Sequence, residues 1–213
     1  MGKNSGACVR TDELFTGVAH AEKYHSGNWI ARKLVNGFMT AVVLAVTEAG
    51  SRDVHEIGCG EGHILGLLAA RGFKVRGGDI STASLDTARV ESKKRGLDLQ
   101  LAEKNIYELN AEDASDTVIC CEVLEHLTDP AAGLRKLVEV AKKDLIVSVP
   151  REPVWRILNM MRGKYLTAWG NTPGHLQHWS PRQFVAFLSE HAEIVSVKLP
   201  LPWIVVHCRP KQK

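Results

Sequence analysis

The residues best suited to chemistry are a glycine-rich turn and an acidic residue at a fixed distance after it. The turn is the run Glu56-Ile57-Gly58-Cys59-Gly60-Glu61-Gly62. Its glycines would let the backbone turn tightly and approach a ligand closely. Asp79 follows Gly60 by 19 residues and ends the next strand-like run, where a carboxylate can accept both hydroxyls of a ribose. The pattern predicts a nucleoside site, with a tight turn and a helix cap at Ser81 as the purely structural alternative.

A second group of reactive side chains lies in the run Glu122-Val-Leu-Glu125-His126. If this segment is helical, its two carboxylates and its imidazole are three and four positions apart and share one face. Such a group is either a general base with an orienting carboxylate or most of a divalent metal site. The sequence leaves both roles open.

Alternating apolar segments predict the elements that position these residues. An early helical pattern is followed by five β/α units and then by two strands joined at Pro200-Leu201-Pro202, a connection short enough for an antiparallel hairpin. The alternation predicts an α/β fold, with a Rossmann-like, mostly parallel seven-stranded sheet and helices on both faces. Expected helices cover 11–48, 64–70, 81–95, 130–142 and 180–191, and expected strands cover 54–57, 73–80, 97–102, 117–120, 145–149, 193–199 and 203–208.

Composition is that of one ordinary globular domain. The chain has 213 residues, 45% hydrophobic and 24% charged, and a formal net charge of +3, which excludes disordered and collagen-like classes. Lys and Arg are spread along the chain, so the charge does not favour a nucleic-acid partner. We expect no transmembrane segment, because the longest apolar stretch, 39–46, is far shorter than a bilayer span. Five scattered cysteines without a CxxC pair indicate reduced thiols and a cytoplasmic location.

The glycine spacing departs from that of dinucleotide-binding proteins. The turn reads GxGxG rather than GxGxxG, and Glu61 would carry negative charge toward a pyrophosphate at the helix N-terminus. A nucleoside with a sulfonium and an amino-acid tail meets no such repulsion. Here the chain resembles the class I S-adenosylmethionine-dependent methyltransferases: residues 56–62 resemble their first motif, Gly78-Asp79-Ile80 their second, and 116–130 their fourth. The likeness is to the subgroup with an EVLEH run, which includes UbiG and the small-RNA 2′-O-methyltransferases.

The resemblance implies a role for each matching position. Gly58 and Gly60 would pack against the methionine tail, Asp79 would hold the ribose, and Tyr24 and Arg32 would close a lid over the methionine carboxylate. Asn105 would accept a hydrogen bond from the adenine amino group, with Glu103 as the alternative acceptor. The whole cofactor set implied in this way is Tyr24, Arg32, Glu56, Gly58, Cys59, Gly60, Asp79, Ile80, Asn105, Ile106 and Cys121.

A metal site is implied by a narrower likeness. The stretch from His175 to Phe184, with Trp179 four residues after His175, resembles one found in small-RNA 3′-terminal 2′-O-methyltransferases. Those enzymes hold magnesium with this histidine and a Glu-x-x-Glu-His run. Carried over, the Mg²⁺ ligands would be Glu122, Glu125, His126 and His175. The chain departs from that family after Pro150, where it reads Arg-Glu-Pro-Val-Trp instead of an Asn-containing stretch.

The segment 151–171 is the expected cover of the methyl acceptor. It is amphipathic and rich in Arg, Trp and Met, which suits a hydrophobic or anionic acceptor, although a core-packing helix has the same pattern. We expect one methyltransferase domain, comprising a helical lid (1–50), a cofactor core (51–150), an acceptor-side insertion (151–179) and a C-terminal helix and hairpin (180–213).

The predicted function is transfer of a methyl group from S-adenosylmethionine to oxygen on a small, lipid-like or glycosidic acceptor. His126 is the predicted base, with Glu122 beside it, because the ordinary pKa of histidine suits proton abstraction near neutral pH. Mg²⁺ assistance is the open alternative for the same side chains. An RNA 3′-terminal ribose as acceptor, and a nicotinamide-dependent oxidoreductase on the same kind of sheet, are the alternative functions.

Overall fold

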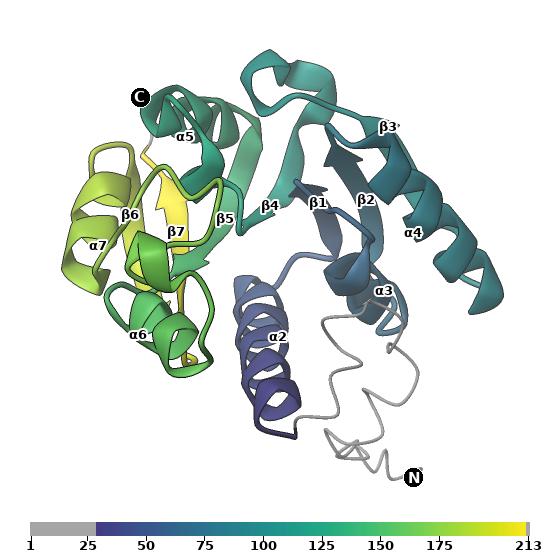
Figure 1. The fold of residues 1–213 in the computed structure, drawn as a ribbon. Helices are drawn as coiled ribbons and strands as arrows, with labels where there is room; N and C mark the ends of the chain where they lie inside the picture. Colours follow the sequence, from purple (N-terminus) through teal and green to yellow (C-terminus); the bar gives the residue numbers. More distant parts are fainter. Residues whose placement is uncertain (1–28, 212–213) are drawn as a thin grey trace, which may run out of the picture.

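A computed structural model describes residues 29–211 and shows one seven-stranded sheet with the order β3-β2-β1-β4-β5-β7-β6. The first five strands are parallel, and β7 runs antiparallel to both β5 and β6 (Figure 1). The predicted Rossmann-like α/β fold with an antiparallel terminal hairpin is confirmed. The strands are β1 (Asp53–Ile57), β2 (Lys74–Asp79), β3 (Gln100–Glu103), β4 (Ser115–Cys121), β5 (Ala141–Pro150), β6 (Ala192–Lys198) and β7 (Trp203–Pro210).

Helices cover both faces of the sheet and make two apolar cores. On one face, α2, α3 and α4 bury side chains such as Val42, Leu65 and Leu85. On the other face, α5 and α7 bury Leu134, Leu137 and Phe184. The helices are α2 (Trp29–Ala49), α3 (His63–Ala69), α4 (Thr82–Lys94), α5 (Pro130–Val140), α6 (Val154–Met161) and α7 (Pro181–Ser189), with short 3₁₀ turns at Ile106–Glu108, Ala111–Asp113, Leu124–His126 and Leu166–Ala168.

Several element boundaries differ from the sequence expectation, and two of the differences have a local cause. The helix predicted over 130–142 ends at Val140, because β5 begins at Ala141 and pairs with Ser115 of β4. The strand predicted from residue 97 begins only at Gln100, since Gly96 adopts a positive φ of 66° and residues 97–99 make the connection. The early helix is described from Trp29, and the part predicted over residues 11–28 lies outside the described residues.

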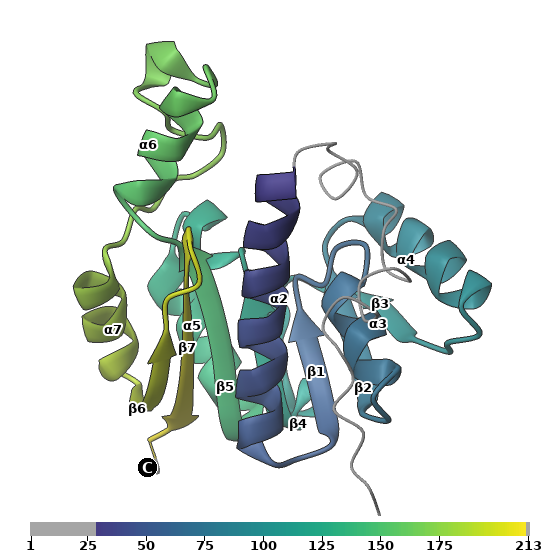
Figure 2. The same ribbon diagram turned by 90° about the horizontal axis from the view of Figure 1, so that it is seen from below.

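Helix α2 explains an unexpected property of the sequence. It is 21 residues long and, by length and hydropathy alone, apolar enough to cross a membrane, contrary to the expectation that no segment is. Its second half is part of the core: Phe38, Met39 and Val42 are at most 7% exposed. The helix lies along the sheet beside β5 and β7 (Figure 2). Packing on the sheet therefore accounts for the buried apolar side chains of its second half, whereas Trp29 and Ile30 at its start are exposed.

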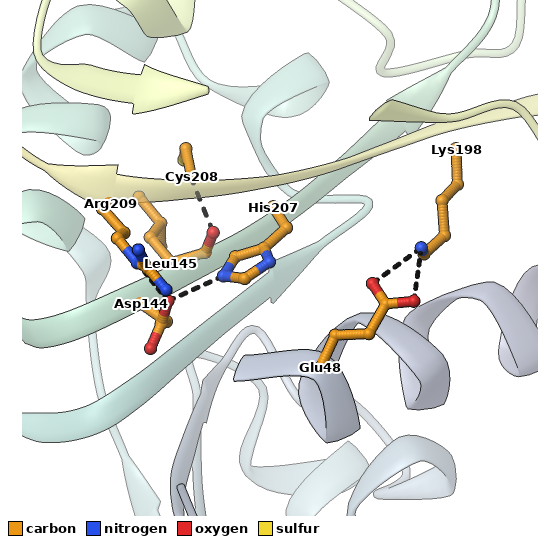
Figure 3. Close-up of polar contacts among 7 residues, drawn as sticks. All are labelled: Glu48, Asp144, Leu145, Lys198, His207, Cys208 and Arg209. Carbon is orange, nitrogen blue, oxygen red and sulfur yellow. Dashed lines mark hydrogen bonds and ion pairs between the residues drawn. The ribbon is translucent and has the colours of Figure 1, made fainter. Parts of the chain in front are cut away.

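Two polar clusters fasten the C-terminal strands (Figure 3). Buried Asp144 at the start of β5 accepts hydrogen bonds from Nε2 of His207 at 2.7 Å and from Nε of Arg209 at 3.2 Å, both on β7. Lys198 of β6 forms an ion pair with Glu48 of α2 at 2.8 Å, and both side chains are partly exposed. The first cluster connects β7 to β5, and the second connects the edge strand β6 to α2.

Candidate active site

The glycine-rich turn and the end of β2 form one hydrogen-bonded unit. The Gly58 amide donates to the Gly78 carbonyl at 2.7 Å, and the Gly60 amide donates to Oδ2 of Asp79, also at 2.7 Å. Oδ1 of Asp79 accepts from the Ser81 amide at 2.8 Å, so the carboxylate also caps the turn into α4. A carboxylate has about four acceptor positions, and two remain for a ribose. The structural and the ligand-binding roles of Asp79 are therefore compatible.

The first glycine is required by both its backbone and its surroundings. Gly58 has a φ of 78°, and a Cβ atom at this position would collide with the Val123 side chain. Residues other than glycine pay a steric penalty in this backbone region. Gly58 thus lets the turn lie directly against the segment after β4.

A cavity of about 970 Å³ opens at the carboxyl ends of β1, β2 and β4. Parallel α/β sheets bind ligands at this edge, where the strand order reverses on either side of β1 and β4. The structure places nine predicted cofactor residues and both predicted catalytic residues on its wall. These are Glu56, Gly58, Cys59, Gly60, Asp79, Ile80, Asn105, Ile106 and Cys121, with Glu122 and His126.

Two predicted lid residues are not among those on the wall. Tyr24 lies outside the described residues. Arg32 is exposed on the first turns of α2 and does not line the cavity. Helix α2 instead contributes Phe38 and Met39, which no local sequence motif indicates.

Three titratable groups on the cavity wall, Glu56, Cys59 and Cys121, are buried. Glu56 is 2% exposed and its Oε2 has no hydrogen-bond partner among the described residues. Burial, reinforced by the nearby Asp79 charge, raises the pKa of Glu56 well above its usual value. Burial likewise raises the pKa values of the Cys59 and Cys121 thiols. These cysteines are neutral wall groups at physiological pH rather than nucleophiles.

Asn105 already uses the atom expected to contact adenine. Its Oδ1 accepts a hydrogen bond from the Tyr107 amide at 3.1 Å and so caps the 3₁₀ turn Ile106–Glu108. The oxygen has a second lone pair that can face a ligand. Glu103, the alternative acceptor, is exposed and is not among the cavity residues, whereas Lys104 and Tyr107 are.

Glu122 is held apart from the residues that follow it. It has a φ of 59°, which is rare for a residue with a side chain. Glu122 therefore does not share one helix face with Glu125 and His126, contrary to the sequence expectation. Its Oε1 accepts from the Ser148 hydroxyl at 3.2 Å and its Oε2 from the Trp203 indole at 2.8 Å. Two side chains from β5 and β7 therefore orient this carboxylate at the cavity wall.

The other three predicted ligands do converge. One ligand atom each from Glu125, His126 and His175 lies within 4.8 Å of the others, whereas Glu122 is not part of that group. Glu125 is 1% exposed, and neither of its carboxylate oxygens has a hydrogen-bond partner within residues 29–211. Burial, followed by repulsion from Glu122, raises the pKa of Glu125 well above its ordinary value. The cluster combines a carboxyl group without partners and two imidazoles.

His126 has a defined tautomer because of its partner. Its Nδ1 lies 2.9 Å from the Gly174 carbonyl oxygen, which can only accept, so Nδ1 carries the proton. In the neutral ring Nε2 therefore has the free lone pair, and this nitrogen can take a proton or bind a cation. His175 packs edge-on against His126 with ring centroids 4.9 Å apart and stacks on Trp155 at 5.8 Å.

Several residues of the site carry no readable signal in the sequence. Trp203 belongs to the C-terminal hairpin and reaches Glu122 only because β7 lies beside β5. Trp155 stacks on His175 through the return of the chain after α6. His63 also lines the cavity, with its Nε2 3.3 Å from Oε2 of Glu61. Contacts between distant segments create these roles.

Comparisons with known proteins agree with this geometry. Residues 55–148 match the family described as Methyltransferase domain. The ubiquinone biosynthesis O-methyltransferase of Rickettsia conorii is 28% identical over 143 residues, which is 65% of this chain and 50% of that relative. The SAH-bound magnesium protoporphyrin IX methyltransferase of Synechocystis has a TM-score of 0.68 at 20% identity, covering 89% of this chain and 92% of the other. The methyltransferase domain of a bacterial Hen1 protein has a TM-score of 0.65 at 20% identity, covering 83% and 99%.

The likenesses to solved structures establish the fold, and the sequence matches span the motifs of the cavity. The chain spans about half to three-fifths of the length of the first curated relatives that it matches. The shared segment contains the glycine-rich turn, Asp79 and the Glu122–His126 run. Residues 55–148 are therefore similar to the methyltransferase domain family, and the comparisons together support a class I S-adenosylmethionine-dependent methyltransferase.

Proposed function

We propose that this chain transfers the methyl group of S-adenosylmethionine to a hydroxyl oxygen of a small, lipid-like acceptor. The observation that carries the proposal is the position of His126, on the wall of the nucleoside cavity with Nδ1 engaged and Nε2 able to accept a proton. The first relatives are named ubiquinone biosynthesis O-methyltransferases, which supports oxygen as the nucleophile and a small, lipid-like acceptor. No support for a nicotinamide-dependent oxidoreductase comes from the comparisons.

In the proposed reaction the residues mainly align two reactants. Asp79 and the glycine-rich turn hold the nucleoside, and the acceptor oxygen lies in line with the methyl–sulfur bond. His126 takes the hydroxyl proton on Nε2 as the carbon–oxygen bond forms and the carbon–sulfur bond breaks, leaving S-adenosylhomocysteine. Glu122, oriented by Ser148 and Trp203, lines the same cavity wall as His126.

Calorimetric titration and a product assay test this proposal. We expect S-adenosylhomocysteine to bind and NADH not to bind. With a catechol as acceptor, mass spectrometry should detect one added methyl group per product molecule. Binding of NADH but not S-adenosylhomocysteine would overturn the proposal.

A divalent cation is a second candidate at the same histidine. The unpartnered, buried carboxyl group of Glu125 next to His126 and His175 favours it, because these groups would fit such a cation. A bound cation would lower the pKa of an acceptor hydroxyl, and Nε2 of His126 would then be a ligand rather than the base.

Titration with Mn²⁺ distinguishes the two roles. If the cluster binds a cation, Mn²⁺ binds the wild type and is lost in Glu125→Gln and His175→Ala. His178→Ala is the matched control, since His178 lies in the same segment but contacts Asn171. If wild type and variants show no Mn²⁺ binding, His126 acts as the base.

A further inference from the structure

Helix α6 and the segment that follows it expose many apolar side chains. Nine consecutive residues, 161–169, are all exposed. Of the fifteen large hydrophobic side chains that are exposed within residues 29–211, six lie between positions 157 and 176. Concentrated exposure of this kind marks an interaction surface, whereas single exposed apolar residues do not. We name this surface the apolar tip; it consists of Ile157, Met161, Tyr165, Leu166, Trp169 and Leu176.

The charge around the apolar tip has one sign. Residues 153–189 contain no Asp or Glu, although the chain as a whole has 24 acidic residues among 213. Arg162 and Lys164 are exposed beside the tip, and neither forms an ion pair with a described residue. An apolar surface surrounded by basic residues is complementary to the headgroup region of an anionic lipid bilayer.

The tip is held in place by its own polar contacts. Nδ2 of Asn159 donates to the Gly170 carbonyl at 2.9 Å, and Nε of Arg156 donates to the Trp169 carbonyl at 3.0 Å. Trp155 anchors the returning chain through a 2.9 Å hydrogen bond from its indole to the Thr172 hydroxyl. The returning backbone at 169–172 is therefore fixed to α6, while the side chains of Leu166 and Trp169 remain 60% and 75% exposed within residues 29–211.

The tip also lies at the functional end of the molecule. In Figure 2, α6 projects from the sheet at the end to which β1 points and where α2 begins. The cofactor cavity opens at this same end, since it is built on the carboxyl ends of the parallel strands. His175, directly before Leu176 of the tip, contacts His126 on the cavity wall. A surface bound by the tip would therefore adjoin the reaction site.

We propose that the apolar tip docks on an anionic lipid surface and thereby presents the cavity to acceptors dissolved in that lipid. Trp169 and Leu166 enter the boundary between headgroups and acyl chains, and Arg162 and Lys164 contact lipid phosphates. Four of the six side chains of the tip are aliphatic or methionine, which favours lipid over single-stranded RNA, because RNA binding of this kind relies on a series of aromatic stacking surfaces. The link to the acceptor rests on the proposed function, but docking itself does not require methyl transfer.

Co-sedimentation with vesicles tests the docking surface. We expect the protein to bind vesicles that contain phosphatidylglycerol, to bind phosphatidylcholine vesicles far less, and to be released by salt. The variants Leu166→Ser/Trp169→Ser and Arg162→Glu/Lys164→Glu should each weaken binding by about tenfold or more. The matched control is Lys74→Glu/Lys93→Glu, which makes the same charge change at exposed positions on β2 and α4 and should bind like the wild type.

Three outcomes would overturn the docking proposal. They are wild-type protein that ignores anionic vesicles, a control variant as impaired as the tip variants, and preferential binding of a single-stranded RNA oligonucleotide through the same residues. Titration with S-adenosylhomocysteine separates this failure from failure of the proposed function. No substituted residue lines the cavity, so the tip variants should retain wild-type affinity for S-adenosylhomocysteine whether or not they bind lipid.

Discussion

The amide of Gly60 donates a 2.7 Å hydrogen bond to the carboxylate of Asp79, which joins the glycine-rich turn to the end of the neighbouring strand. The bond fixes the glycine-rich turn and the end of β2, which are the two halves of the proposed nucleoside site, relative to each other. The Ser81 amide donates to the other carboxylate oxygen of Asp79, so the two hydrogen bonds together orient this side chain. The spacing of 19 residues seen in the sequence is thus a direct contact in the fold.

Replacement of Asp79 by Asn should weaken binding of S-adenosylhomocysteine by about tenfold to a hundredfold. The amide keeps the size of the side chain but turns one acceptor into a donor that faces a backbone N–H group, at a cost of roughly 1–3 kcal/mol. Calorimetric titration measures the affinity. Asp98→Asn, an exposed change, is the control. Equal affinity in wild type and Asp79→Asn would remove Asp79 from the binding site.

Replacement of His126 by Ala should lower kcat by about a hundredfold to ten-thousandfold while affinity for S-adenosylhomocysteine stays unchanged. General base catalysis has this magnitude, and Nε2 is the nitrogen free to take the proton. Steady-state kinetics with a catechol acceptor measures kcat. His191→Ala is a suitable control, since this histidine lies outside the cavity. Full activity of His126→Ala would assign the base elsewhere.

Replacement of Glu56 by Gln should change how the stability of the ligand-free protein depends on pH. Burial raises the folded-state pKa of Glu56 above its usual value of 4.5, so the folded state holds the proton more tightly than the unfolded state. This contribution favours the folded state below the unfolded pKa and is lost as pH rises through the folded pKa. Gln cannot ionise and avoids that loss.

The Glu56→Gln variant should therefore gain stability relative to the wild type as pH rises above 4.5. Urea unfolding at a series of pH values measures the difference in unfolding free energy. Glu61→Gln, on a partly exposed residue of the same turn, provides the comparison. A constant difference between wild type and Glu56→Gln would show that Glu56 ionises alike in both states.

Replacement of Asp144 by Ala should destabilise the protein by about 3 kcal/mol, because a buried His207 ring loses its partner and Arg209 loses its anchor. The Glu48→Ala change removes a partly exposed ion pair to Lys198 and should cost less than about 1 kcal/mol. Both variants lie outside the described cavity wall and can be compared by urea unfolding. Similar losses in the two variants would contradict the assignment of Asp144 as the main fastening of β7.

The sequence by itself determined the order of strands and helices and most of the cofactor cavity. Local patterns suffice for these features: apolar runs alternate with helical periods, and Gly58, Gly60 and Asp79 lie at strand ends that a parallel sheet must bring to one edge. Because parallel strands all end at the same edge of the sheet, residues that follow two neighbouring strands are close in space although they are far apart in the sequence. The helix boundary at Val140 was missed, because pairing of Ala141 with β4 overrides local helix preference.

Only the tertiary structure decided that Glu122 is separate from the cluster formed by Glu125 and His126. The left-handed backbone at Glu122 separates this residue from Glu125 and His126, and contacts from Ser148 and Trp203 hold it. His175 joins the cluster, and Trp155 packs behind it, because the chain projects after β5 and then returns to the cavity. The exposure of Trp169 has the same origin. The helical periodicity of a sequence predicts which residues form the apolar face of a helix. Whether another segment covers that face depends on long-range packing.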